Sequence, residues 1–110
     1  MAKKADALQG ALDLLILKTL DARGPLHGYG IALHVESLSD AVLRMEEGSL
    51  YPALHRLEQS GWVGSNWRTS ENNRRAKFYA ITRAGRQRLA EEERNWRQVA
   101  AAIHRVLQLA

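Results

Sequence analysis

The sequence predicts a mainly α-helical fold that contains one small β-hairpin and ends in a long helix. Three observations support this prediction. Apolar residues recur at helical spacing over the first 60 positions, and two short runs of strand character separated by a polar turn follow at residues 62–81. After the hairpin, apolar residues repeat every seven positions towards the C-terminus. We therefore expect a single domain of helices with one hairpin.

Length and composition limit the possible functions. The chain has 110 residues, the size of one ordinary domain, and its lack of cysteine excludes a disulfide framework and a cysteine nucleophile. No apolar run approaches the ~18 residues of a membrane span, so a cytoplasmic protein without a membrane partner is expected. The formal net charge is +4, and residues 61–90 carry seven Lys or Arg against one acidic residue. This distribution admits nucleic acid as a partner without requiring it.

The first two helices are predicted over about residues 7–22 and 28–38. Residues 23–25 are a cation, a glycine and a proline, which is a typical helix-ending sequence. Apolar residues cover more than one side of the first helix, whereas a helix with one solvated face needs only a single stripe. We therefore expect the first helix to pack against its own domain and, through Leu14 and Leu17, against a second chain.

A third helix is predicted over about residues 50–60, with the Ser49 hydroxyl as its N-cap. Pro52 falls in the first turn, where a backbone N–H has no intrahelical partner to lose. Leu50, Leu54 and Leu57 recur at helical spacing and form the stripe that faces the core. The residues on the opposite side of this helix are mostly polar.

Residues 62–68 and 76–81 are predicted to pair as a β-hairpin. The first run alternates, and this places Val63, Ser65 and Trp67 on one face, while the second run is rich in aromatic and branched residues. The polar segment 69–75 forms the turn and places basic residues at the tip. Trp62 and Trp67 are expected to pack within the hairpin.

The last helix is predicted over about residues 83–107, with Thr82 as its cap. At this length it extends about 37 Å, farther than a small domain can cover, so its apolar edge requires a partner. The heptad repeat is imperfect because acidic residues interrupt it, but it still favours contact with a second copy. The residues of this helix predicted to form that dimer contact are Leu89, Trp96, Val99, Ala100, Ile103 and Leu107.

Three helices, a hairpin and a further helix describe a winged helix-turn-helix over residues 1–82 and a dimerisation helix over 83–110 in the same compact unit. The third helix would then lie in the major groove of double-stranded DNA, with the hairpin, or wing, on the backbone or minor groove. Arg56 is expected to donate two hydrogen bonds to guanine. The residues predicted to contact DNA are Tyr29, Ser49, Tyr51, Pro52, His55, Arg56, Gln59, Asn73, Arg74, Arg75 and Lys77.

Several motifs resemble the PadR family of bacterial transcriptional regulators. They are HGYGI at 27–31, EGSLYPAL at 47–54, RLE at 56–58 and YAITRAG at 79–85, and the resemblance covers about residues 8–107. Residues 70–79 are similar to a short subgroup found mainly in acidobacterial genomes. The resemblance implies a winged-helix homodimer, usually a repressor, that binds a pseudo-palindromic operator. Ser49 stands where the family more often has Thr, and the single C-terminal helix weakens the case for a dedicated ligand-sensing domain.

Other interpretations stay open at this point. An aromatic residue on the last helix lines a ligand-binding pore in some short relatives, so the resemblance suggests Trp96 as a contact for a small hydrophobic effector. The alternative is that Trp96 packs only in the dimer. A winged helix can also serve as a protein–protein adaptor, and the basic hairpin can be no more than a solvated surface.

The sequence does not favour an enzyme. Its four histidines show no metal-ligand spacing with acidic partners, and an HExxH pattern is absent. A phosphate-binding glycine loop is also absent, and no serine lies in a nucleophile elbow. We expect no catalytic residues, no metal and no cofactor.

Overall fold

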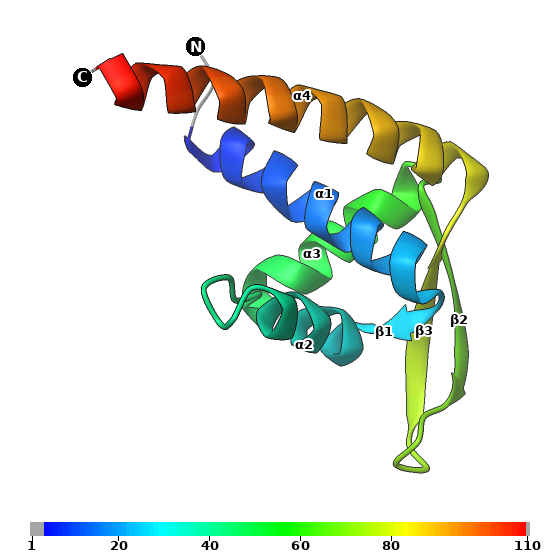
Figure 1. Cartoon of the computed structure of the whole chain (residues 1–110). Coiled ribbons are helices and arrows are strands. Elements are labelled where there is room, and N and C mark those ends of the chain that lie inside the picture. Colours follow the sequence, from blue (N-terminus) through cyan, green and yellow to red (C-terminus); the bar gives the residue numbers. More distant parts are fainter. Residues whose placement is uncertain (1–3, 110) are drawn as a thin grey trace.

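The computed structural model describes residues 4–109 and has the mainly helical fold with a small sheet that the sequence predicts (Figure 1). Residues 1–3 and 110, which the two predicted units include, lie outside the described residues. Three strands form one antiparallel sheet in the order β1-β3-β2. In chain order the elements are α1 (Lys4–Arg23), β1 (Leu26–His27), α2 (Gly28–Leu38), α3 (Glu47–Gln59), β2 (Val63–Thr69), β3 (Arg75–Ile81) and α4 (Arg83–Leu109).

The core lies where α1 meets the other helices and the sheet. α1 contacts α2, α3, β3 and α4. Its residues Ile16, Leu17 and Leu20 pack in one buried cluster with Ile31 of α2 and Leu54 of α3. Removing this apolar surface from water is the main stabilising contribution to such a fold. α1 is therefore the element against which both α3 and the sheet are positioned.

Two helices begin earlier than predicted. α1 begins at Lys4 rather than near residue 7, and α3 begins at Glu47, with Glu46 as its N-cap residue. The N–H groups of Ser49 and Leu50 donate to the Glu46 carbonyl at 3.0 and 2.9 Å, so the prediction that Ser49 is the N-cap is wrong. The negative charge of Glu47 in the first turn favours the earlier start, because it complements the positive end of the helix dipole.

Strand β1 was not predicted. Its two residues pair with β3, Leu26 opposite Tyr79 and His27 opposite Phe78. Two residues are too few to show an alternating pattern in the sequence. The strand forms because the chain between α1 and α2 passes along the free edge of β3, and it holds the start of α2 close to the wing.

β2 and β3 form the predicted hairpin. The register runs from Val63 opposite Ile81 to Thr69 opposite Arg75. At the turn, the N–H of Ser70 donates to the Arg74 carbonyl at 2.7 Å, and the next residues reverse the chain. The hairpin extends past the helices, so its tip projects from the body of the molecule (Figure 1). This shape is that of a wing.

The start of α4 is fixed by a close backbone contact. A Cβ atom at Gly85 would lie 2.0 Å from the carbonyl oxygen of Trp62, so only glycine permits this approach. The predicted cap is confirmed, because the Thr82 hydroxyl accepts from the N–H of Gly85 at 3.0 Å and donates to the Gly61 carbonyl at 2.7 Å. The hairpin and α4 therefore leave this corner in defined directions.

Beyond its first turns, α4 runs beside α1 (Figure 1). This part of the helix carries exposed apolar side chains. Ion pairs at 3.3 Å join Lys18 to Glu93 and Asp21 to Arg86 across the two helices. Within the described residues the long axis of the molecule extends 54 Å, against 29 and 24 Å for the others. The exposed large apolar residues of α4 are Trp96, Val99, Ile103, Val106 and Leu107.

The single chain already buries part of the predicted dimer contact. Leu17 has no exposed surface and Leu89 is 4% exposed, so neither has surface to offer a second chain, and their inclusion was wrong. The sequence could not separate these residues from a dimer surface, because core packing and dimer packing use the same apolar spacing. Leu14 is half-buried against the core. The exposed residues of the predicted contact are Trp96, Val99, Ala100, Ile103 and Leu107.

Candidate nucleic-acid interface

α3 presents one polar face to solvent. Its core side consists of the four buried residues Leu50, Ala53, Leu54 and Leu57. Its exposed residues include Glu47 and Gly48 at the start of the helix and five predicted DNA contacts, which are Ser49, Tyr51, Pro52, His55 and Gln59. Pro52 is the sixth residue of the helix, so the prediction that it falls in the first turn is wrong: an N–H at this position would have the Gly48 carbonyl as its intrahelical partner, yet the helix continues through the proline. The helix therefore offers aromatic, imidazole and amide groups on a rigid support.

Arg56 lies at the edge of this face and pairs with α1. Its Nη1 and Nη2 atoms donate to Oδ2 and Oδ1 of Asp13 at 3.0 and 3.1 Å, which makes a bidentate ion pair. α1 thus supplies a carboxylate that engages the guanidinium expected to bind guanine, and the contact of Arg56 with DNA stays a prediction. The sequence held one signal for this pair, since Asp13 is the only charged residue in the apolar stretch 7–17.

Glu58, the last residue but one of α3, joins this helix to the wing. Its carboxylate accepts hydrogen bonds from the Ser65 hydroxyl at 2.5 Å and the Lys77 ammonium at 3.2 Å. The bond from Ser65 lowers the pKa of Glu58, burial opposes this effect, and Lys77 lowers the pKa further. The charged carboxylate thus holds both strands against α3, and it compensates the charge of Lys77, a predicted DNA contact.

A groove of about 350 Å³ lies between the start of α2, Tyr51 of α3 and the wing. Aromatic side chains on its lining are well exposed, at 70% for Tyr29, 45% for Tyr51 and 58% for Trp67. Basic side chains lie beside them, so the groove suits a ligand with both negative charge and flat apolar surfaces. The predicted DNA contacts that line it come from three separate segments and are Tyr29, Tyr51, Arg74, Arg75 and Lys77.

Local backbone features fix the aromatic side of the groove. A Cβ at Gly28 would lie 2.7 Å from the hydroxyl oxygen of Tyr51, so this glycine makes room for the tyrosine ring. The His27 Nδ1 atom accepts from the N–H of Gly30 at 3.0 Å and caps α2. The His27 ring also meets Phe78 edge-on, with ring centroids 5.1 Å apart. Through these contacts α2 and β3 keep a fixed spacing.

The wing tip carries exposed cations. Asn73 and Arg74 lie exposed in the turn, where Asn73 has a φ of 58°. Asparagine tolerates this left-handed conformation better than most residues. The Arg75 guanidinium lies 5.8 Å from the centre of the Trp67 ring, within cation–π range. In the described chain, neither Arg74 nor Arg75 has a carboxylate within ion-pair distance.

Trp67 lines the groove, and the sequence interpretation did not place it there. Trp62 is half-buried against the core, with the Arg88 guanidinium of α4 4.6 Å from its ring centre. Trp67 does not pack in this way, because β2 leaves the cover of α3 along its length. The first residue of β2 is buried, the next two are half-buried, and the last four, which include Trp67, are exposed. In the sequence, the position of Trp67 close to the predicted turn was the signal that its side chain would be exposed.

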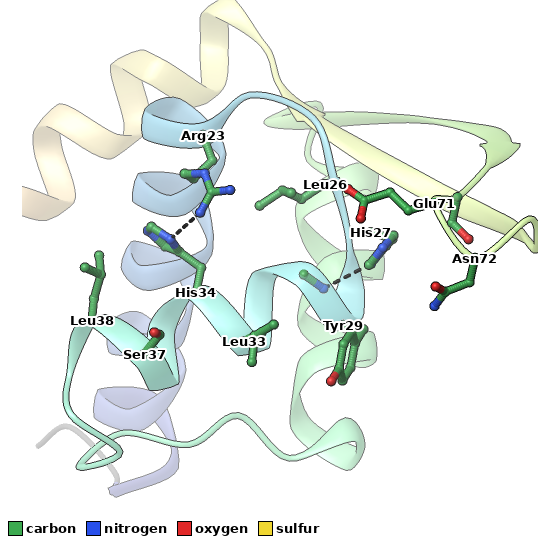
Figure 2. A pocket seen from close by; sticks show the side chains of 12 residues that line it. Arg23, Leu26, His27, Tyr29, Leu33, His34, Ser37, Leu38, Glu71 and Asn72 are labelled. Carbon is green, nitrogen blue, oxygen red and sulfur yellow. Dashed lines mark hydrogen bonds between the residues drawn. The ribbon is translucent and has the colours of Figure 1, made fainter.

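A second hollow, of about 510 Å³, lies along α2 and shares His27 and Tyr29 with the groove (Figure 2). In it, Nη1 of Arg23 lies 3.2 Å from Nδ1 of His34. Glu71 of the wing turn also lines this hollow, and its negative charge disfavours phosphate. Of the predicted DNA contacts, only Tyr29 lines both the groove and this hollow.

Trp96 lies on the exposed apolar stretch of α4 and is 49% exposed. It lines neither the groove nor the hollow along α2. Its predicted contact with an effector therefore stays a prediction.

Across residues 4–109, no group of three or more His, Asp or Glu side chains is placed to hold a metal ion. None of the helices in this range is long and apolar enough to cross a membrane.

A solvent-facing polar helix beside a projecting basic hairpin defines a winged helix-turn-helix protein. A family model described as the transcriptional regulator PadR-like family matches residues 16–91. The chain thus belongs to the PadR-like family of transcriptional regulators, and the resemblance drawn from its motifs is confirmed.

Individual relatives agree with this assignment. The chain is 35% identical over 82 residues to a transcriptional regulator from Mycobacterium tuberculosis, covering 74% of this chain and 73% of that protein. A solved transcriptional regulator from Clostridium thermocellum has a TM-score of 0.80 at 28% identity, covering 91% of this chain and 96% of that one. A PadR-family regulator from Eggerthella lenta has a TM-score of 0.74 at 30% identity, covering 94% and 88%.

Proposed function

We propose that this transcriptional regulator is a homodimeric repressor that binds a pseudo-palindromic operator in double-stranded DNA. The observation that carries the proposal is the groove, where α3, the start of α2 and the basic wing meet. A cytoplasmic location follows from this proposal, because the operator lies there in bacteria. The relatives that support it are transcriptional regulators rather than enzymes.

Base recognition belongs to the exposed face of α3. His55 and Gln59 lie one turn apart on this face, and both carry groups that form hydrogen bonds with base edges in the major groove. Pro52 and Tyr51 add apolar surface near the helix start, and Ser49 adds a hydroxyl. We leave Arg56 out of this set because Asp13 engages its guanidinium.

Backbone contact belongs to the wing and to α2. Arg74 and Arg75 are exposed cations, Asn73 is an uncharged donor beside them, and the Tyr29 hydroxyl lies across the groove. Such groups set the position of a protein on the duplex by binding phosphate oxygens. Lys77 contributes less than Arg74 and Arg75, because Glu58 already compensates its charge.

Dimerisation belongs to α4. Val99, Ile103 and Val106 are among several large apolar residues exposed along one stretch of this helix, and grouped exposed apolar residues are typical of a contact surface. Two-fold pairing of this surface would present two copies of α3 to one side of a duplex. Half-sites should then lie about 10 bp apart, or a multiple of this spacing.

Footprinting tests the proposal directly. The purified chain is titrated onto DNA taken from upstream of its own gene, and onto a scrambled duplex of the same length and composition. We expect two protected segments related by a two-fold axis on the first DNA alone. Equal protection of both duplexes would contradict sequence-specific regulation, and no binding to either would favour a protein–protein adaptor.

A further inference from the structure

α1 carries two aspartates that each pair with an arginine of another helix. Asp13 pairs with Arg56 of α3 at 3.0 and 3.1 Å, and Asp21 pairs with Arg86 of α4 at 3.3 Å. The two pairs have the same chemistry, but only the first lies at the edge of the helix that would enter the major groove. This difference allows the contribution of the first pair to DNA binding to be isolated.

The Asp13–Arg56 pair is more protected from water than the other. The side chain of Asp13 is 13% exposed and that of Arg56 is 37%, against 37% for Asp21 and 60% for Arg86. Bidentate geometry with partial burial strengthens a charge-assisted bond, because water competes poorly for either group. A DNA phosphate that approached Arg56 would therefore have to compete with a carboxylate already in place.

The pair also determines which charges α3 brings to DNA. Arg56 is the only Lys or Arg residue of α3. With Arg56 held by Asp13, the face centred on Pro52, His55 and Gln59 carries little net charge. Contacts by such groups depend on the base sequence, whereas a free cation binds any phosphate.

We propose that Asp13 is a specificity-determining residue that withholds Arg56 from the DNA backbone. This inference rests on the proposed DNA-binding function and adds a role for a residue outside the groove. Sequence-independent attraction then comes from Arg74 and Arg75 of the wing, which are exposed and have no carboxylate within ion-pair distance in the described structure. α3 then discriminates between bases without adding a cation that would strengthen binding to every site.

The test compares Asp13→Asn with Asp21→Asn, which removes the same charge and a similar ion pair away from α3. Affinity for the footprinted site and for a scrambled duplex is measured from 50 to 200 mM salt. We expect Asp13→Asn to steepen the salt slope on scrambled DNA by about 0.9, the value for one added phosphate contact. This slope corresponds to about 3.5-fold more loss of affinity over that salt range. The ratio of specific to scrambled affinity should fall, and Asp21→Asn should change neither quantity.

Two further variants separate this role from a structural one. Arg56→Gln in the Asp13→Asn background should restore the original slope, because the released cation is then absent. Arg56→Gln alone keeps an N–H donor for Asp13 and should leave the salt slope unchanged. If Asp13→Asn does not fold, this variant tests the inference in its place. A slope that is about 0.9 shallower in Arg56→Gln would show that Arg56 already contacts phosphate and would overturn the inference.

The outcomes also distinguish this inference from the proposed function. If the unmodified chain binds the footprinted site but Asp13→Asn and Asp21→Asn behave alike, the inference fails and the proposed function stands. If the unmodified chain binds neither duplex, the proposed function fails and the inference fails with it.

Discussion

Gly85 is a residue at which one methyl group should alter stability. A Cβ there would lie 2.0 Å from the Trp62 carbonyl oxygen, so Gly85→Ala requires the backbone to shift. We expect a loss of about 1–3 kcal/mol in the free energy of unfolding, measured by chemical denaturation. Gly10→Ala is the matched control, because its Cβ would meet nothing within 4 Å and alanine favours a helix by about 1 kcal/mol. Equal stabilities for Gly85→Ala and the unmodified chain would contradict the close contact.

Glu58 should make stability depend on pH. Its pKa is lowered in the folded chain, chiefly by the Ser65 hydroxyl. Its contribution is therefore fully present above the ordinary carboxyl pKa of about 4.3 and is lost as the pH falls through the lowered folded value. Denaturation of the unmodified chain and of Glu58→Gln should show a stability difference at pH 7 that closes in acid. Ser65→Ala should reduce the same difference, and a difference that stays constant from neutral to acidic pH would contradict this role.

Residue orientation was the least predictable part of the candidate site. The exposure of Tyr51, His55 and Gln59 follows from helical spacing, which the sequence shows directly. The orientation of Arg56 depends on Asp13, 43 residues away in sequence, and only the packing of α3 on α1 brings the two together. Trp67 was expected to pack within the hairpin, but it lies on the outer part of β2, where the last four residues of the strand are exposed.

The wing, as an element, should supply the salt-dependent part of DNA binding. Arg74→Ala with Arg75→Ala removes two exposed cations at its tip, so the slope of log affinity against log salt should become shallower by up to about 1.8. Arg94→Ala with Arg105→Ala is the matched control, because it removes two exposed arginines of α4. Affinities measured by fluorescence anisotropy at several salt concentrations would give both slopes. An unchanged slope in the wing variant would remove the wing from the interface.

Elements were predictable where their own sequence specifies them. The periodicity of apolar residues predicts α2, and the alternation in residues 62–68 predicts the hairpin. The Thr82 hydroxyl predicts the cap of α4. β1 has no such signal, since its two residues become a strand only beside β3. The start of α3 was misplaced because Ser49 is a good capping residue, yet the chain already becomes helical at Glu47.

The whole molecule should depend on α4 for assembly. Ile103 is 53% exposed in the apolar stretch of that helix, so Ile103→Glu places a charge in the proposed contact between copies. We expect this variant to sediment as a folded monomer and to bind the operator more weakly than the unmodified dimer. Gln98→Glu adds the same charge at another exposed position of α4 and should remain dimeric. If the unmodified chain sediments as a monomer at micromolar concentration, the result contradicts the proposed assembly.

The central position of α1 links assembly to recognition. The helix pairs with α3 through Asp13 and with α4 through Lys18 and Asp21. In the proposed dimer, a small change in the angle between the two copies of α4 would move α1 and, with it, α3. The distance between the two copies of α3 would then change. The half-site spacing that the dimer binds would therefore report the angle at which the two subunits join.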